Sequence, residues 1–364
     1  MKLIAKRHKP LLVLDANTLL TYHQGWICRM DIGSGKYARI CKLPIGFWRR
    51  MLSKIRVLER LLRNEVRTAV SISDTEVLLS YNGAVYHINL ESRVITKEYA
   101  FRNGMRGPLG FVKIQGINGF DDCIAFGEYI PNFDRQYDVA IYTRPLTEAK
   151  WKQSYVFPVG KVRHIHNINV NKELSKVFVL TGDTDAESGI WEARNNFTEV
   201  VPIATGNQEY RCVHVFSNGT ELYYASDAPQ YQNYIYRLTL GSEIRTDKVA
   251  WICGSCIYAA ETQNYYLFAS TVEPDEDLKG WRLYLSTKPG PGITGKNVEI
   301  VAVDKRNGKV STAASFRKDS LPYVLFQYGN VAVLPIKGID EVVIYPMSVK
   351  KFDGNIYKIN VASE

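Results

Sequence analysis

Short runs of apolar and alternating residues recur about every ten residues from residue 66 onwards, and this repeat constrains the fold more than any other feature of the chain. Examples are EVLLSYNG, AVYHINL, KVFVLTGD, ELYYASD and NYYLFAST. Gly, Asn, Asp or Pro separates the runs, and the pairs Asn82-Gly83 and Asn218-Gly219 favour tight β-hairpin turns. Because helical periodicity is nearly absent here, an all-β protein is predicted.

Grouping the runs in fours gives units of about 40 to 50 residues, the size of a four-stranded propeller blade. Six units start near Val66, Gly107, Trp151, Val200, Val249 and Val298. The leftover ends, LLVLDANTLL with WICRMDI and EVVIYPM with NIYKINV, are expected to pair into one closing blade, which hides sheet edges. We therefore predict a single β-propeller domain over residues 1–364, with four-stranded antiparallel blades and seven blades favoured over six.

One segment, residues 46–63, interrupts the β pattern. In GFWRRMLSKIRVLERLLRN, apolar residues recur at helical spacing opposite a basic face, which predicts an inserted amphipathic helix. The apolar positions are Phe47, Met51, Ile55, Leu58 and Leu62, and the basic ones are Arg49, Arg50, Lys54, Arg56, Arg60 and Arg63. Two interpretations stay open: the helix packs on the propeller with its basic face in solvent, or that face lies on an anionic membrane surface.

The charge of the chain favours anionic partners. Its 46 Lys and Arg residues exceed its 37 Asp and Glu residues, which gives a net charge of +9. The apolar run LLVL near the N-terminus is broken at Asp15 and Asn17, so it is too short for a signal-peptide core, and no run is long enough to cross a membrane. We expect a cytoplasmic protein, with peripheral binding at the inner face of the membrane as a further option.

The six cysteines are scattered through strand-like runs and do not form a disulfide pattern. Cys253 and Cys256 make the single Cys-x-x-Cys pair, with neither a second pair nor a following helix. Buried strand cysteines are therefore the preferred interpretation over a metal or redox site.

The densest polar segment is Arg163-His164-Ile165-His166-Asn167, followed by TGDTDAESGIW. If residues 163–170 form a strand, His164 and His166 project to one face while Arg163 and Ile165 project to the other. Such a pair of imidazoles can bind a metal, transfer protons, orient a sugar, or form a structural hydrogen-bonded pair. A divalent metal would need a further ligand, and the candidates are His214, Glu128, Asp183 and Gln327.

A propeller gathers side chains from successive blades at its axis, so polar residues that recur in equivalent strands are candidates for one site. Arginine clamps a carboxylate through two hydrogen bonds, and a carboxylic acid beside it can protonate a glycosidic oxygen. The recurring residues therefore suit an anionic sugar. They are Glu128, Tyr129, Asp183, Arg211, Asp227, Arg237, Glu273 and Tyr328.

Several segments resemble one family, in order, from about residue 60 to residue 329. They are RLLRNEV, FGEYIPN, FPVGKVRHIHN, LTGDTDAESGIW, ASDAP, NYIYRL, ASTVE and SFRKDSLPYVLFQYG. They resemble mostly uncharacterised sialidase-like propellers, related to BNR or Asp-box proteins, from bacterial exopolysaccharide and capsule gene clusters. The resemblance implies the propeller more than it implies sialidase activity, because YTRPLTEAKW keeps the Trp of an Asp-box turn but lacks its Asp and Gly.

The leading hypothesis is a carbohydrate-active propeller that binds, and cleaves by hydrolysis or elimination, an acidic surface polysaccharide or its precursor. This would make the protein a sialidase-like glycoside hydrolase or a polysaccharide lyase. No cofactor is expected, unless His164 and His166 hold a divalent metal. The alternative is a non-catalytic glycan-binding or membrane-associated scaffold of polysaccharide biosynthesis, and a nucleic-acid partner is not expected.

Roles follow for the candidate site residues. His164 or His166 is predicted to act as base or acid, Asp183 as proton donor, and Glu128 as a further catalytic carboxyl group. Substrate binding is assigned to Arg163, Arg211, Arg237, Asp227, Glu273 and Tyr328.

Overall fold

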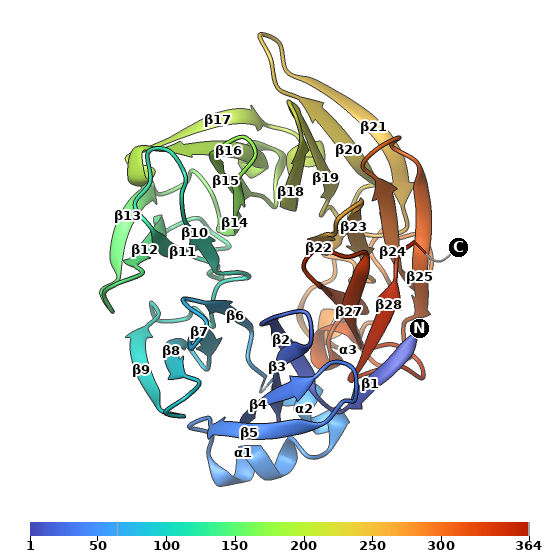
Figure 1. Cartoon of the computed structure of the whole chain (residues 1–364). Coiled ribbons are helices and arrows are strands. Elements are labelled where there is room, and N and C mark those ends of the chain that lie inside the picture. Colours follow the sequence, from blue (N-terminus) through green and yellow to red (C-terminus); the bar gives the residue numbers. More distant parts are fainter. Residues whose placement is uncertain (64, 363–364) are drawn as a thin grey trace. The chain divides into compact units, whose positions relative to one another are not determined.

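Seven four-stranded antiparallel sheets make up the structure, a computed structural model that describes residues 1–63 and 65–362. They are the blades of a seven-bladed β-propeller, as predicted. We number the blades in chain order, and Figure 1 labels their strands. The chain groups into two compact units, and the prediction of one domain over residues 1–364 stays a prediction. The first unit contains Met1–Glu65, Asp227–Ile235 and Lys248–Glu364, and the second contains Val66–Ser226 and Tyr236–Asp247.

Strand bounds for the first four blades are as follows. Blade 1 is β2 (Lys9–Val13), β3 (Thr18–His23), β4 (Trp26–Asp31) and β5 (Tyr37–Lys42). Blade 2 is β6 (Thr68–Ser71), β7 (Glu76–Tyr81), β8 (Ala84–Asn89) and β9 (Ile95–Ala100). Blade 3 is β10 (Val112–Ile114), β11 (Cys123–Gly127), β12 (Val139–Pro145) and β13 (Lys152–Phe157). Blade 4 is β14 (Ile165–Asn171), β15 (Lys176–Thr181), β16 (Gly189–Arg194) and β17 (Glu199–Thr205).

The remaining blades complete the set. Blade 5 is β18 (Cys212–Asn218), β19 (Glu221–Ser226), β20 (Asn233–Thr239) and β21 (Arg245–Ile252). Blade 6 is β22 (Cys256–Glu261), β23 (Tyr265–Ser270), β24 (Asn297–Asp304) and β25 (Val310–Arg317). Blade 7 is β26 (Asn330–Pro335), β27 (Glu341–Met347) and β28 (Asn355–Asn360), with β1 (Lys2–Lys6) as its fourth strand.

The helices are short. They are α1 (Phe47–Leu52), α2 (Arg56–Leu62), α3 (Gly280–Leu285) and α4 (Tyr323–Phe326), with single turns η1 (Asp185–Glu187), η2 (Asn195–Phe197) and η3 (Gln208–Tyr210). In the part of the chain that the structure describes, none of the helices has the length and apolar character that a membrane span requires.

Burial explains why the central strands read as continuous apolar runs. In β15, KVFVLT, every residue after the first is buried, whereas the outer strand β9, ITKEYA, has no buried residue. A strand with both faces covered needs apolar residues at every position, and an outer strand does not. In the second unit the core includes a stack of Phe126 on Tyr142, with ring centroids 5.1 Å apart, against which Trp151 also packs. The first unit has its own core around Ile300, Val331 and Ile344.

Hairpin turns lie where the sequence predicted them. Asn82 and Gly83 both have positive φ, 45° and 77°, and they join Tyr81 to its cross-strand partner Ala84. Two successive residues with positive φ match the right-handed twist of the flanking strands, which is why Asn-Gly is favoured there. Gly219 likewise has a φ of 59° between β18 and β19.

The prediction for the chain ends named the wrong N-terminal strands for the closing blade. The segment LLVLDANTLL with WICRMDI does not join the C-terminal strands, because it lies in blade 1, a complete four-stranded sheet of its own. Only β1 crosses to the C-terminal strands, where Lys2 pairs with Lys358 and Lys6 with Asn355 (Figure 1). One blade is therefore closed by strands from both ends, as predicted, but with a single N-terminal strand.

The predicted blade boundaries hold for Val66 and Gly107, which precede β6 and β10, and fail from the third unit onwards. Trp151, Val200 and Val249 fall at or within fourth strands, β13, β17 and β21, and Val298 falls in β24. Turns within a blade and connections between blades contain the same residue types. The spacing of the runs therefore gives the length of the repeat but not the strand at which each blade begins.

The single helix predicted at 46–63 is wrong. The chain forms α1 and α2, separated by Ser53 and by Ile55, which has an extended backbone with φ −101° and ψ 114°. In this segment the side that faces the protein is polar, because Glu59 and Arg60 are buried while Met51 and Ile55 are exposed. The physical reason is ion pairing, because acidic side chains from distant parts of the first unit bind the arginines of α2.

Two of those arginines are not part of a solvated basic face. Arg56 Nε donates to Asp353 Oδ2 at 2.9 Å, and its Nη1 lies 2.8 Å from Glu65 Oε1. Arg60, 3% exposed, donates to Asp319 Oδ2 at 2.6 Å and to the Phe326 carbonyl at 2.7 Å. Arg56 and Arg60 therefore attach α2 to the rest of the first unit.

Removal of residues 1–6 should destabilise the first unit, because β28 loses the strand that covers its edge. Each lost ladder hydrogen bond contributes about 1 kcal/mol, so the free energy of unfolding should fall by a few kcal/mol. Urea denaturation followed by tryptophan fluorescence measures this. The control is Leu3→Ala, which keeps the backbone pairing and removes a side chain that is 42% exposed. It should change the free energy of unfolding by less than about 0.5 kcal/mol, and an equal loss in both proteins would contradict the assignment.

Candidate functional site

A polar cluster lies where β14 begins and β15 ends, in blade 4 of the second unit. Ile165 is paired with Thr181, so the residues around Ile165 lie beside Gly182 and Asp183, which follow Thr181 in the chain. The register shifts between Ile165 and Asn167, which marks a bulge in β14. Bulges redirect side chains at strand ends, and here the result is that two histidines face one aspartate.

His164, His166 and Asp183 form the centre of the site, which we call the His–Asp cluster. His164 Nε2 lies 3.3 Å from Asp183 Oδ2, and His166 Nε2 lies 3.5 Å from Asp183 Oδ1. The two imidazole rings have centroids 5.1 Å apart. One potential ligand atom from each of the three residues lies within 4.8 Å of the others. The predicted pairing of the two histidines is confirmed, and Asp183 joins them.

Two arginines hold the carboxylate of Asp183. Arg163 Nη1 donates to Asp183 Oδ2 at 2.7 Å, and Arg211 Nη2 lies 3.2 Å from Asp183 Oδ1. Arg211 also donates from Nη1 to the backbone carbonyl of Asp183 at 3.0 Å. The predicted separation of Arg163 from the histidines fails, because Arg163 precedes β14 and the alternation of a strand does not apply to it.

Burial dominates the electrostatics of His164. Its side chain is 3% exposed, and burial lowers its pKa to about 4, although the contact with Asp183 acts in the opposite direction. Burial alone would raise the pKa of Asp183, but the contacts with His164 and His166 and the charge of Arg211 hold that pKa well below its usual range. A carboxyl group held in its ionised form is a poor proton donor, which argues against the acid role predicted for Asp183.

The ring nitrogens of both histidines have oxygen neighbours on two sides. Nδ1 of His164 lies 3.4 Å from the carbonyl oxygen of Ile130, and Nδ1 of His166 lies 3.2 Å from that of Cys212, while each Nε2 faces Asp183. A neutral imidazole carries one proton, so it cannot donate on both sides. His164 Nε2 is buried and, among the described residues, makes no hydrogen bond of good geometry, although Asp183 Oδ2 lies 3.3 Å away. A cation beside Nε2 would give this nitrogen a partner, whereas the carboxylate of Asp183 is already bound by Arg163 and Arg211.

The backbone conformation at Gly182 and Asp183 allows neighbouring side chains to come close. Asp183 has a φ of 120°, a conformation that residues with a side chain rarely adopt and that accumulates at functional sites. At Gly182, a Cβ would lie 2.6 Å from His166 Cε1 and 2.8 Å from Arg211 Cγ. Glycine at this position is therefore what allows the histidine and the arginine to reach the aspartate.

Aromatic and charged residues surround the cluster. Tyr129 stacks on His164 with ring centroids 4.0 Å apart, and the Arg67 guanidinium lies 5.0 Å above the Tyr129 ring. The Arg163 guanidinium lies 4.0 Å above the ring of Phe133, which is 62% exposed. Nearby in the chain, Arg135 pairs with Glu187. Phe133 and Arg135 were not singled out from the sequence, because nothing in PNFDRQYD distinguishes them from ordinary loop residues.

Glu128, predicted to be catalytic, is engaged elsewhere. Its Oε2 accepts the amide hydrogen of Ala140 at 2.9 Å, and its Oε1 lies 3.3 Å from Arg102 Nε. Burial is the main cause that raises its pKa. These partners lie in blade 3 and in the segment after β9, so Glu128 has a structural role that the sequence did not indicate.

The predicted substrate-binding residues separate into groups. Arg163 and Arg211 belong to the His–Asp cluster, as described above. Arg237 on β20 instead pairs with Glu221 and Asp247 at 3.5 and 3.1 Å. In the first unit, Tyr328 is partly buried and its pKa is raised to about 12, chiefly by desolvation and then by the charge of Glu273, with a smaller effect from Asp227.

All six cysteines are buried and free of disulfides, as the sequence predicted. Burial is the main cause that raises the pKa of both Cys253 and Cys256. Such thiols are poor nucleophiles and poor metal ligands, which supports the interpretation of the Cys-x-x-Cys pair as buried strand residues.

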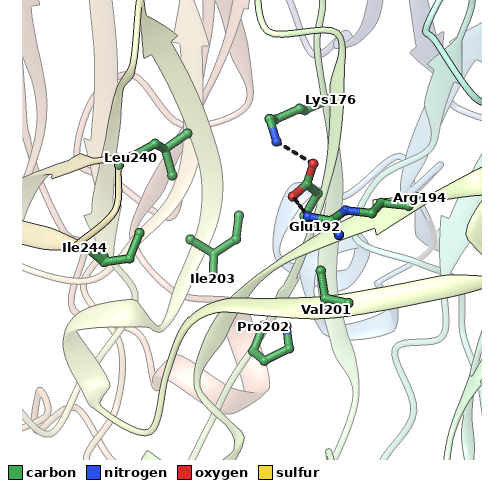
Figure 2. Close-up of a pocket in the computed structure, with 9 residues that line it drawn as sticks. Lys176, Glu192, Arg194, Val201, Pro202, Ile203, Leu240 and Ile244 are labelled. Atoms are coloured by element: carbon green, nitrogen blue, oxygen red, sulfur yellow. Dashed lines mark hydrogen bonds and ion pairs between the residues drawn. The ribbon is translucent and has the colours of Figure 1, made fainter.

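A separate cavity of about 340 Å³ lies on the outer strands of blade 4 and the hairpin between β20 and β21. Figure 2 shows Lys176 and Arg194 both directed at the carboxylate of Glu192, with Ile203, Leu240 and Ile244 across the opening. None of the residues predicted for the site lines this cavity. Its charges are already paired with one another, so it offers no obvious chemistry.

Comparison with known proteins identifies the fold. No protein-family model matches the chain, and no curated protein matches it. An oligogalacturonate lyase in complex with manganese is similar, with a TM-score of 0.56 and 10% identity over 98% of this chain and 90% of that one. The oligogalacturonate lyase from Vibrio parahaemolyticus has a TM-score of 0.52 and 8% identity over 91% and 88%. The AfRom2 CNH domain has a TM-score of 0.56 and 10% identity over 97% and 94%.

At these identities the likeness shows the fold alone, so the class of protein established here is the β-propeller. The sialidase-like family that the sequence resembles is not shown by these comparisons. What the protein does must be argued from the His–Asp cluster.

Gly182→Ala tests the geometry of this cluster. The added methyl group should displace His166 and Arg211 from Asp183, lowering the free energy of unfolding by about 1–3 kcal/mol through overpacking. Denaturant unfolding and the histidine resonances in NMR spectra measure both effects. Gly46→Ala is the control, because a Cβ there meets no atom within 4 Å and its φ is −59°. Unchanged histidine resonances in Gly182→Ala would contradict the proposed packing.

Proposed function

We propose that this protein is a carbohydrate-active propeller that binds an acidic saccharide at the His–Asp cluster and cleaves it by elimination. The observation that carries the proposal is the convergence of His164, His166 and Asp183 with two guanidinium groups at one strand end. The oligogalacturonate lyases named above support it, since lyase chemistry on an acidic saccharide occurs on this fold. A bacterial surface polysaccharide, or its precursor, is the substrate class that the sequence resemblance adds.

The cluster suits a divalent cation as its cofactor. Two imidazole nitrogens and one carboxylate form a donor set that first-row divalent metals accept, and backbone carbonyls on Nδ1 leave Nε2 as the ligand atom. The structural sign of this fit is the buried Nε2 of His164, which faces Asp183 at 3.3 Å and makes no well-formed hydrogen bond to any described residue. A bound cation would supply a positive charge that neutralises a uronate carboxylate. The structure of an oligogalacturonate lyase in complex with manganese supports the choice of Mn²⁺ as probe.

The residues of the chain would bind and orient the substrate. In uronate elimination a base takes the C5 proton, the C4–O bond breaks with its electron pair on the departing oxygen, which takes up a proton, and a C4=C5 double bond forms. Negative charge builds up on the carboxylate as the C5 proton leaves, so positive charge there lowers the barrier. Arg163 is the candidate for this contact, because its side chain is 21% exposed whereas that of Arg211 is 7% exposed. Arg211 instead holds Asp183 in position. The exposed ring of Phe133 beside Arg163 offers a face on which a sugar can stack.

Hydrolysis of the sialidase type is less well supported. That chemistry needs a carboxylic acid that donates a proton to the leaving oxygen, and the ionised Asp183 does not suit this role. Glu128, whose pKa is raised, is occupied by Arg102 and the Ala140 amide. Elimination therefore agrees better with the charges in this part of the chain.

Metal binding is the first prediction from this proposal. Mn²⁺ titrated into the purified chain should bind at a single site, measured by calorimetry and by loss of the free Mn²⁺ signal in electron paramagnetic resonance. His164→Ala and His166→Ala should each weaken binding by at least about tenfold, because each removes one ligand. His87→Ala is the matched control, since His87 lies in the second unit beside Glu76 and outside the cluster. Equal Mn²⁺ affinity in all four proteins would contradict the site.

Elimination activity is the second prediction. Acidic oligosaccharides that contain uronate should give products with a new C4=C5 double bond, which is followed by ultraviolet absorbance. Arg163→Ala should lower kcat/KM by about 100-fold, in line with the loss of one charged group that stabilises the transition state. Arg194→Ala, on the outer cavity, should leave kcat/KM unchanged. Binding of acidic oligosaccharides without any new absorbance would exclude elimination, and an unchanged oligosaccharide length in the same reaction would support the non-catalytic alternative.

A further inference from the structure

An unusual share of the exposed apolar residues gathers on three short helices of the first unit. Among the described residues, 23 large hydrophobic side chains are exposed, and eleven of them lie on or next to α1, α2 and α3. We call these eleven the helical apolar surface. They are Phe47, Trp48, Met51, Leu52, Ile55, Val57, Leu61, Leu62, Trp281, Tyr284 and Leu285. Trp48 is 77% exposed and Trp281 is 70% exposed, which is far outside the usual range for tryptophan in a folded protein.

Contacts through α4 bring α2 and α3 together, although they are more than two hundred residues apart in sequence. Arg63 on the α2 side donates to the carbonyl of Val324 at 2.6 Å, and Arg60 donates to that of Phe326. The amide of Tyr323 donates to the carbonyl of Ser286, directly after α3, at 3.1 Å. Helices α2 and α3 are therefore neighbours around α4, and α1 lies beside α2. A cluster of exposed apolar residues of this kind marks an interaction surface.

The outward charges of α1 and α2 are positive. Arg49, Lys54 and Arg63 are exposed and Arg50 is half-buried. Among described residues 47–63 the one acidic side chain is Glu59, which is buried and paired with Arg56. The two arginines that reach inward, Arg56 and Arg60, are neutralised by Glu65, Asp353 and Asp319, so they fasten the helix and do not contribute to the outer charge.

A surface that binds in the headgroup region of a membrane typically contains aromatic residues beside basic ones. Tryptophan and tyrosine prefer the boundary between water and hydrocarbon, and lysine and arginine attract anionic headgroups. A second copy of the chain is a poorer occupant. In a symmetric dimer this surface would meet itself, so Arg49, Arg50 and Lys54 would face the same cations of the partner.

We propose that the helical apolar surface docks the protein on an anionic lipid bilayer, with Trp48 and Trp281 inserted at the interface and the basic residues of α1 and α2 on the headgroups. This function is independent of the chemistry at the His–Asp cluster. It would hold the propeller beside substrates or partner enzymes at a membrane.

Vesicle flotation of the full chain tests the proposal. The protein should float with vesicles of phosphatidylcholine mixed with phosphatidylglycerol, and should remain at the bottom with phosphatidylcholine alone. High salt should weaken binding, because it screens the contacts with headgroups. Trp48→Ala and Trp281→Ala should each weaken binding several-fold. Trp251→Ala, which removes a tryptophan that is 61% exposed on β21 of the same unit, should bind like the wild type.

Charge is tested separately from the aromatic residues. The triple variant Arg49→Glu, Arg50→Glu, Lys54→Glu should weaken binding to the mixed vesicles by at least about tenfold, since each cation near an anionic surface contributes to affinity. Lys97→Glu, Lys150→Glu, Lys172→Glu changes the net charge equally at three exposed positions of the second unit. It should retain most of the binding. Equal losses in the two triple variants would show attraction by net charge alone and would overturn the proposal.

Two further results would overturn it. The first is no flotation with the mixed vesicles by a protein whose cooperative unfolding in urea shows that it is folded. The second is a dimer in analytical ultracentrifugation that Trp48→Ala converts to a monomer, because a second copy would then cover this surface. Each result leaves the proposed function at the His–Asp cluster untouched.

Discussion

A four-stranded sheet with two apolar faces cannot be stable alone, and this constraint underlies the rest of the structure. The central strands β7 and β15 are buried along nearly their whole length, so their sheets must pack face to face with others. Strand side chains are thereby committed to the core, as Ile165 and Val179 show in the second unit. Polar chemistry is left to the residues just before and just after strands. His164, Gly182 and Asp183 occupy such positions, directly beside the Ile165–Thr181 pair.

The sequence predicts the fold well because the two-residue alternation, the turn residues and the repeat length all point to the same architecture. It also predicts that His164 and His166 lie together, but strand alternation is not the cause, because His164 precedes β14 and His166 lies at the bulge. The contact of Asp183 with both histidines depends on a bulge in β14 and on a positive φ at Asp183, and neither leaves a sequence pattern. The prediction that the basic side of α2 faces outward was wrong for a related reason. The partners of Arg56 and Arg60 are Asp353 and Asp319, which helical periodicity cannot reveal.

Positive charge has two uses in this protein. Arg60 and Arg211 are buried and each is paired with a carboxylate, so they hold other groups in place. Arg49 and Lys54 remain exposed on helices whose outer side is apolar. A net charge of +9 does not distinguish these uses. The degree of burial does, because a buried arginine held by a carboxylate is enclosed by the protein, whereas an exposed cation can reach an external anion.

The similar structures also show why the site must carry the functional argument. An oligogalacturonate lyase and the AfRom2 CNH domain have the same TM-score of 0.56 to this chain, so the likeness in fold does not select an activity. A buried ionised cluster is costly, and replacing such a cluster by apolar residues of similar volume is often neutral or stabilising by about 1–4 kcal/mol. Blade 4 nevertheless contains two buried histidines, an aspartate with a φ of 120° and two arginines at one strand end. Since packing alone does not require these residues, their arrangement is explained more directly by a ligand that binds there.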